Sequence, residues 1–353
     1  MKRLLFLILG LSVSFGCLAY AMRNTSLQQL RVAFANADYS TLPLILGTIF
    51  GFYWLKAIRW KWLLNPVAAL PTKDLFPPVM IGFAANNILP AHLGEFVRVF
   101  VANRKFRIPA STVLSTIVLE RILDVLAILA LFGIGLFYAP EMPAGYRQAA
   151  LVFGGAAAAI VVMVVLYLIW TDLFIQITAW CFARIPFLPH RLTEKVLQML
   201  QQGAEGLHAL KNGRTVVALT VNSLAQWTLN GLGACLCLRA FHIDVDLSTG
   251  LILTGITAFG VMIPAAPGYF GVIQICFETA MKAQAIQPDP EQVLGASLYS
   301  QISSFIPVTA LGMYYLQQAQ LRLSDVSRVA DATQELADKS SPDTIILPAS
   351  VAD

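Results

Sequence analysis

Three short stretches of this sequence carry polar and ionisable side chains within surroundings that are otherwise strongly apolar. The first stretch, residues 86–100, reads NNILPAHLGEFVRVF. Pro90 interrupts a helix and Gly94 tolerates unusual backbone dihedrals, so we expect a break followed by a new helix. Glu95 and Arg98 are three residues apart and share one face of that helix, where they could bind a ligand or simply pair with each other. The candidate binding residues of this stretch are Asn87, His92, Glu95 and Arg98.

The second stretch, LERILDVL at residues 119–126, places three charges inside a long apolar run. Glu120 and Asp124 are four residues apart on one helix face, where two carboxylates repel each other unless a cation lies nearby. Arg121 of the same helix, or Arg98 or His92 of the first stretch, could supply that cation. One alternative is that this buried cluster serves helix packing alone. Three buried charges are, however, an energetically expensive way to pack helices. We therefore interpret these three residues as part of a site for a charged ligand or for protons.

The third stretch, IPAAPGYFGVIQICFETA at residues 263–280, also reads as two helices separated by a turn. The prolines end the first helix and the glycines allow the turn, which leaves free N–H groups at the start of the second helix. Such a helix end attracts anions and suits a phosphate. Gln274 and Glu278 are four residues apart on one face of the second helix, although a tight hairpin with Glu278 reaching the surface is the alternative. The residues expected to shape this turn are Pro264, Pro267, Gly268 and Gly271.

The composition assigns these stretches to a membrane protein. The 353 residues are 57% hydrophobic and only 12% charged, and the mean hydropathy is +0.69. Soluble domains are typically about 25% charged, so this chain cannot cover a soluble surface with polar groups. Cys235 and Cys237 are too close together for the usual zinc spacing and have no second ligand pair. We expect no metal, no cofactor and no nucleic-acid partner.

Six apolar segments are each long enough to cross a bilayer, which needs about 20 residues. They are residues 4–22, 42–64, 111–138, 148–170, 215–238 and 293–316. The first could instead be a cleaved signal peptide, but its length favours an uncleaved span. Two further apolar regions, residues 76–101 and 247–281, are interrupted at 86–94 and 263–271. The sequence therefore predicts an all-α polytopic membrane protein with about six full spans.

Lysine and arginine residues set the orientation, because cytoplasmic loops are rich in them. With the N-terminus in the cytoplasm and both interrupted regions read as re-entrant hairpins, most of them fall on the cytoplasmic side, with Lys56, Arg59 and Arg98 in that group. Full crossings would move the basic residues at 104–107 and 184–214 to the outside and violate the rule. We therefore expect two oppositely oriented re-entrant helical hairpins.

This arrangement makes two halves of the same topology and opposite orientation, about residues 1–140 and 147–317. An inverted-topology repeat is frequent in secondary transporters, and broken helices at matching positions indicate a substrate site near the midplane. Residues 191–212 read as an amphipathic helix at the cytoplasmic interface. We expect one transmembrane domain, residues 1–320, followed by a polar cytoplasmic tail, residues 321–353, that is partly disordered.

Together, the three stretches resemble the lysylphosphatidylglycerol synthase transmembrane family, also called flippase-like or UPF0104 proteins, which includes the N-terminal flippase module of the multiple peptide resistance factor. The family pattern is N-x₂-P-x-R-x-GE-x₂-R, then ER-x₂-D, then P-x₂-PG-x₂-G-x₂-E, and the resemblance covers roughly residues 1–320. The matching residues are Asn87, Pro90, Gly94, Glu95, Arg98, Glu120, Arg121, Asp124, Pro264, Pro267, Gly268 and Gly271.

The sequence departs from that pattern at two positions. His92 stands where the family usually has arginine, and Gln274 stands where a glutamate follows the last glycine, with Glu278 one turn later. These changes leave open whether the transported head group is lysylphosphatidylglycerol. The sequence holds no counterpart of the family's synthase domain, so we expect no aminoacyl transfer.

The resemblance and the buried charges imply an integral membrane transporter of the flippase type, in the plasma (inner) membrane of a bacterium, with both termini in the cytoplasm. It would move a phospholipid or a polyprenyl-linked glycolipid between leaflets. Arg121, Arg98 and His92 are expected to hold the lipid phosphate, and Glu95, Glu120 and Asp124 to position those cations or carry protons. The alternatives are a membrane-embedded lipid-modifying enzyme, against which the lack of a nucleophile motif argues, and an accessory scaffold for enzymes of envelope synthesis.

Overall fold

The computed structural model describes residues 2–89, 93–139, 213–262 and 268–321, together with seven single positions between 148 and 182; for residues 2–9, 11 and 213 it describes only the backbone. All regular secondary structure in these ranges is helical. The predicted helical class is therefore confirmed for the described part of the chain. The expected span at 148–170, the amphipathic helix at 191–212 and most of the tail lie outside the described residues.

The first long helices follow the predicted segments closely, and one short helix between them was not predicted. Helix α1 is Lys2–Met22, the short helix α2 is Leu27–Ala35, and a 3₁₀ turn at Tyr39–Thr41 leads into α3, Leu42–Leu64. Helices α4, Thr72–Ile88, and α5, Gly94–Phe106, flank the first break, and α6 is Ala110–Tyr138. The break expected at residues 86–94 therefore occurs between Ile88 and Gly94.

The remaining helices match the other predicted segments. Helix α10 is Gly213–Ala240, and α13 is Pro290–Gln318. Between them, α11, Leu247–Gly260, and α12, Val272–Ala283, flank the second break. Asp246 caps the start of α11 by accepting a hydrogen bond from the Thr249 N–H, at 3.0 Å. The interruption expected at residues 263–271 is thus also a break between two helices.

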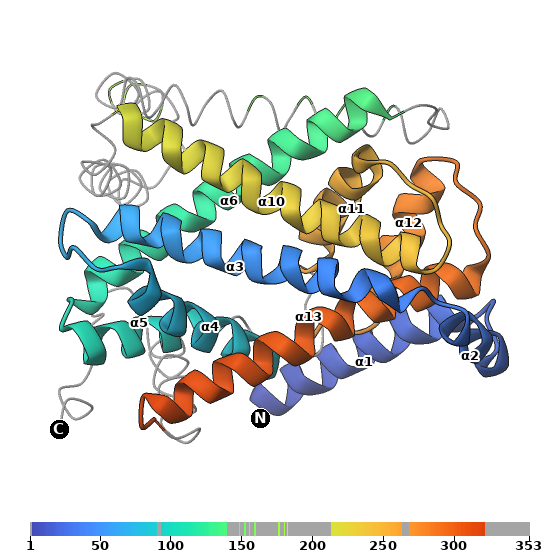
Figure 1. Ribbon diagram of the computed structural model, residues 1–353, viewed down its shortest axis with the longest axis horizontal. Helices are drawn as coiled ribbons and strands as arrows, with labels where there is room; N and C mark the ends of the chain where they lie inside the picture. The colour runs from blue at the N-terminus through green and yellow to red at the C-terminus, as the bar shows by residue number, and fades with distance from the viewer. Residues whose placement is uncertain are drawn as a thin grey trace.

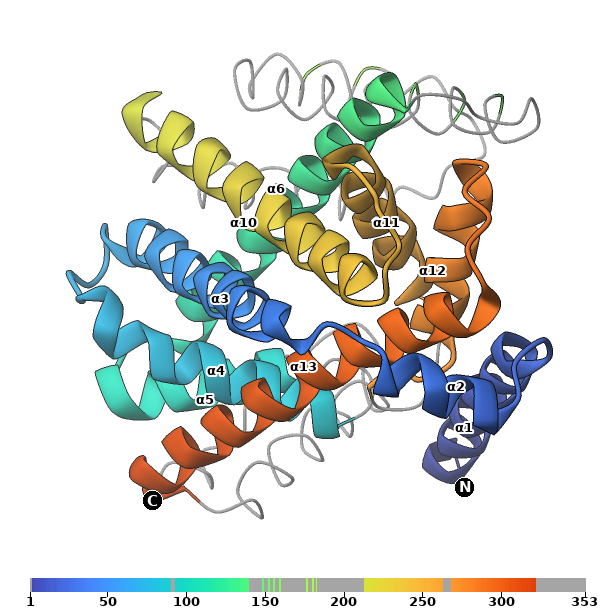
Figure 2. The same ribbon diagram turned by 45° about the vertical axis from the view of Figure 1, so that its right-hand side comes forward.

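Helices α3, α6, α10 and α13 run along the molecule, while α4 and α5 occupy one end and α11 and α12 the other, in both views (Figures 1 and 2). The packing has matching pairs: α4 contacts α13 and α11 contacts α6, α3 contacts α4 and α10 contacts α11, and α3 contacts α10. Each broken pair also packs on itself, α4 on α5 and α11 on α12. The two breaks therefore occupy equivalent places in the contact pattern.

Glycines allow the closest helix contacts near the breaks. At Gly94, a Cβ atom would collide with the Gly82 carbonyl oxygen, so glycine lets α5 lie against α4. Gly271 has a φ of +90°, which disfavours other residues, and α1 passes directly over it at Ser14 and Leu18. These contacts determine where α5 and α12, the second helices of the two broken pairs, begin.

Within the described residues, the stretch Tyr39–Leu64 is long and apolar enough to cross a membrane by length and composition. The six-span count and the re-entrant course of the two hairpins stay predictions.

Candidate functional site

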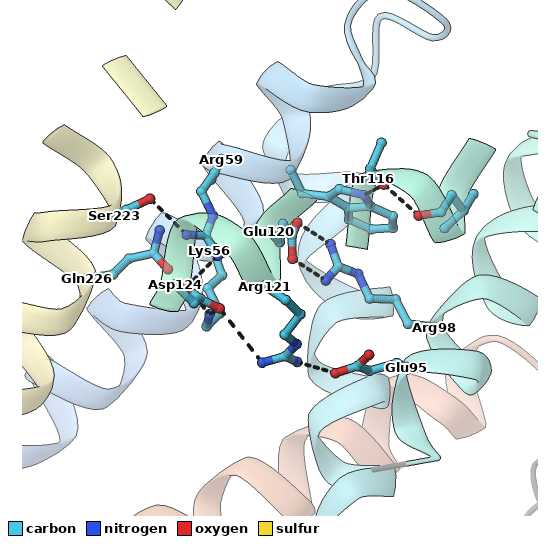
Figure 3. Close-up of polar contacts among 12 residues, drawn as sticks. Lys56, Arg59, Glu95, Arg98, Thr116, Glu120, Arg121, Asp124, Ser223 and Gln226 are labelled. Atoms are coloured by element: carbon cyan, nitrogen blue, oxygen red, sulfur yellow. Dashed lines mark hydrogen bonds and ion pairs between the residues drawn. The ribbon is translucent and has the colours of Figure 1, made fainter. Parts of the chain in front are cut away.

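The candidate site is a network of seven charged side chains beside the first break, contributed by three helices (Figure 3). Helix α6 supplies both buried carboxylates: Glu120 is 4% exposed and Asp124 is 3% exposed. Their spacing of four residues places them on one helix face, as the sequence predicted. The charged network consists of Lys56 and Arg59 of α3, Glu95 and Arg98 of α5, and Glu120, Arg121 and Asp124 of α6.

Arg98 neutralises Glu120. Its Nη1 and Nη2 atoms each lie 2.8 Å from one carboxylate oxygen of Glu120, which is the bidentate geometry that makes arginine–carboxylate pairs strong. The guanidinium also stacks on the Trp60 ring, 3.7 Å from its centroid, and the Trp60 indole donates to the Thr116 hydroxyl at 3.0 Å. Arg98 is 4% exposed, and both of its terminal nitrogens are bonded inside the protein, while its buried Nε atom has no hydrogen-bond partner.

Asp124 collects donors from two further helices. Lys56 Nζ lies 3.0 Å from Asp124 Oδ2, and Arg59 Nη2 lies 2.8 Å from Oδ1. From α10, the Trp227 indole N–H donates to Oδ1 at 2.9 Å, and the Ser223 hydroxyl accepts from Arg59 Nη1 at 2.9 Å. One carboxylate therefore joins α3, α6 and α10.

Arg121 forms the accessible edge of the network. Its Nη2 atom lies 2.6 Å from Glu95 Oε1, while Nη1 lies 3.7 Å from Asp124 Oδ2. The Arg121 side chain is 43% exposed and that of Glu95 is 25% exposed, whereas the other members are almost fully buried. Tyr269 of the second break lies within electrostatic range of Arg121. Arg121 is therefore the most exposed member of the network.

The structure corrects two interpretations of the sequence. Glu95 and Arg98 do not pair with each other; each pairs with a residue of α6. Lys56 and Arg59, counted above among the cytoplasmic basic residues, are 2% and 0% exposed and contact Asp124. Arg98, counted in the same group, is buried as well. These three residues do not contribute to a basic cytoplasmic surface.

Lys56 and Arg59 are the functional candidates that the sequence interpretation missed. A signal was present, because two cations three residues apart share one face of a helix that is otherwise largely apolar. They lie close to the end of a predicted span, where long basic side chains can reach the interface. For that reason the sequence assigned both residues to the cytoplasmic side, and their buried contacts with Asp124 were not predicted.

Asparagines close the first break. The Asn86 side chain accepts a hydrogen bond from the Gly94 N–H at 2.7 Å, across the gap between α4 and α5. The Asn87 amide donates to the Thr309 hydroxyl of α13 at 2.9 Å. Asn87 therefore anchors the end of α4, in addition to its predicted role in binding. Pro90 and His92 lie outside the described residues.

The second break is closed by neutral amides. The Gly271 N–H donates to Gln274 Oε1 at 2.6 Å, and Gln274 Nε2 donates to Gln301 Oε1 of α13 at 2.8 Å. The Gln301 amide in turn donates to the Gly268 carbonyl. Gln274 is 2% exposed, and its side chain stabilises the turn that precedes its own helix. The Gly271 N–H, which is the first donor of the expected anion site, is therefore already bonded to Gln274. Pro264 and Pro267 lie outside the described residues.

Glu278 lies farther along α12, at the surface. It pairs with Arg23 at 2.7 Å and with Lys282 at 2.6 Å, and its side chain is 25% exposed. These three residues and Gln274 line a cavity of about 250 Å³. The alternative in which Glu278 reaches the surface therefore describes its position. Among the described residues, no group of three or more His, Cys, Asp or Glu side chains could hold a metal ion.

With this geometry in place, comparisons with known proteins identify the family. The sequence model of the lysylphosphatidylglycerol synthase TM region matches residues 7–312. The chain belongs to this family. The resemblance inferred from the three motifs is thereby confirmed, and the chain is a membrane protein, as the family is.

Two curated relatives of this family member are distant. A protein named glycosyltransferase AglD, from Haloferax volcanii, is 24% identical over 318 residues, which is 80% of this chain and 50% of AglD. A UPF0104 membrane protein from Methanothermobacter thermautotrophicus is 23% identical over 277 residues, which is 73% of this chain and 79% of that protein. The chain spans about half the length of AglD, so AglD's activity does not transfer with the match.

Proposed function

We propose that this family member is a lipid transporter of the flippase type, which moves a phospholipid or a lipid-linked glycan between leaflets. The observation that carries the proposal is the charged network at the first break, with Arg121 as its accessible edge. Ionisable groups at membrane depth cost about 2.5–3.5 kcal/mol each on insertion scales and usually mark substrate or ion pathways.

In this proposal the two breaks are re-entrant hairpins of an inverted-topology repeat, with halves at about residues 1–140 and 147–317. The matching helix contacts support this arrangement, because a repeat places equivalent helices in equivalent contacts. The protein would lie in a bacterial plasma membrane with both termini in the cytoplasm, as the basic loop residues indicate.

The geometry refines the roles proposed for individual residues. Arg121 would contact the lipid phosphate, since its guanidinium is half exposed and Glu95 can be exchanged for another anion. Arg98 and Glu120 would position the helices around it, because they form a bidentate ion pair in the interior. Asp124 would attract Arg121 toward the network electrostatically, without a hydrogen bond that fixes its position.

Reconstitution of the purified protein into vesicles tests the proposal. We expect labelled lipid to cross the bilayer, and Arg121→Ala and Glu95→Gln to slow this transfer by at least about tenfold, which is 1.4 kcal/mol. Lys61→Ala is the matched control, because Lys61 lies on α3 outside the network. Normal transfer rates in both variants would contradict the assigned roles.

An enzyme is the second candidate, because one relative is named a glycosyltransferase. Formation of a modified lipid by the purified protein, from a lipid donor and an acceptor, would favour this reading over transport. A scaffold for enzymes of envelope synthesis would instead bind a partner enzyme and keep its function after Glu95 and Arg121 are neutralised.

A further inference from the structure

The charged network holds one more cation than carboxylates among the described residues. Arg98 pairs with Glu120, and Arg121 pairs with Glu95. Lys56 and Arg59 remain, and they share the single carboxylate of Asp124. The surplus positive charge therefore lies at Asp124, where the edge of Arg121 also approaches.

This surplus is buried and has only partial compensation. The Lys56 ammonium lies 4.9, 5.6 and 5.5 Å from the ring centroids of Phe52, Phe83 and Trp227. Aromatic faces attract a cation, but they bring no formal negative charge. The Arg59 Nε atom is buried without a hydrogen-bond partner. An uncompensated buried charge costs several kcal/mol, so a nearby anion would stabilise this arrangement.

Among the network side chains, Arg121 and its partner Glu95 are the exposed ones, at 43% and 25%, since the others are at most 5% exposed. The Arg121 Nη1 atom is 3.7 Å from Asp124, too far for a hydrogen bond, so it can turn toward an incoming group. An anion that binds this edge is attracted by the surplus charge through surroundings of low polarity, where such attraction is strong.

We infer that the site selects lipid head groups that carry a net negative charge, such as a phosphodiester or diphosphate without a balancing ammonium group. This inference rests on the proposed transport function and names its substrate class. A zwitterionic head group gains less from the surplus charge. A head group with more ammonium groups than phosphates, such as a lysylated phosphatidylglycerol, is repelled by it. Lys56 is then a residue that determines specificity without being exposed to the substrate.

Binding tests the inference independently of transport. The protein in detergent is titrated with phosphatidylglycerol, phosphatidylcholine or lysylated phosphatidylglycerol, and its thermal unfolding midpoint is followed, since a bound ligand raises it. Phosphatidylglycerol should act at a concentration about tenfold lower than phosphatidylcholine, a difference of 1.4 kcal/mol. Lys56→Met and Arg121→Gln should remove this preference, and Lys61→Met should keep it.

Equal responses to all three lipids would overturn the inference, and so would a preference that persists in both Lys56→Met and Arg121→Gln. If Lys56→Met does not fold, Arg121→Gln decides alone, because its side chain is half exposed. Vesicle assays with the same lipids separate the two claims. Equal transfer of all three lipids refutes the head-group selection and leaves the transport function standing. If no lipid is transferred, the transport function fails, and the binding preference still decides the inference.

Discussion

Neutral amides close both breaks, but among the described residues only the first break is surrounded by a network of ionised side chains. At the first, four cations and three carboxylates from α3, α5 and α6 meet beside Gly94. At the second, Gln274 and Gln301 satisfy the turn at Gly268 and Gly271. Both breaks occupy equivalent places in the helix packing.

This difference distinguishes side chains that satisfy the backbone of a turn from side chains that are suited to binding a ligand. A broken helix leaves backbone groups without partners, and two glutamine side chains are enough to satisfy such groups at modest cost. Buried ion pairs are seldom more stable than apolar packing of similar volume, because the desolvation of both charges offsets their attraction. The charged network therefore has no advantage as a closure for the first break, which favours a role in binding.

The largest expected effect is the loss of one partner of a buried ion pair at the first break. Glu120→Gln leaves Arg98 in the interior without a carboxylate, and we expect about 3–5 kcal/mol of destabilisation. The double variant Arg98→Met, Glu120→Met should be more stable than this single variant, because neither charge remains. Thermal unfolding in detergent measures both. A double variant that is less stable than the single one would show that the pair stabilises the fold.

A smaller effect is expected at the second break. Gln274→Leu removes the acceptor of the Gly271 N–H and the partner of Gln301, and an unsatisfied buried group costs about 1–3 kcal/mol. The unfolding midpoint should fall, while the folded fraction should still transfer lipid. Gln292→Leu at the start of α13 is a surface control. If Gln274→Leu stops transfer but leaves the midpoint unchanged, the second break contacts the substrate, and the contrast between the two breaks is lost.

The smallest effect is expected at Glu278, which is paired near the surface. Glu278→Gln weakens its contacts with Arg23 and Lys282, and partly exposed ion pairs contribute only about 0–1 kcal/mol. Lipid transfer should remain within about twofold of the unaltered protein, a difference below 0.5 kcal/mol. A tenfold loss of transfer would restore Glu278 to the substrate site and extend that site to the far end of α12.

The sequence alone predicted most of the helical framework. The segment at 42–64 coincides with α3, and both interruptions occur where proline and glycine were noted. These features are local: length and apolar composition determine the helices, and helix-breaking residues determine where they end. The three motifs were also sufficient to recognise the family, which the match over residues 7–312 confirms.

Which charges meet was decided by the tertiary structure. The spacing of Glu95 and Arg98 permits a pair within α5, but packing against α6 directs each to a different partner. Lys56 and Arg59 looked like residues at the end of a span, and only the approach of α6 and α10 shows that they surround Asp124. Spacing along one helix defines a face, whereas the partner of that face depends on how whole helices pack. The sequence therefore determined the helices, the breaks and the family, and the packing of α3, α5, α6 and α10 decided the composition of the site.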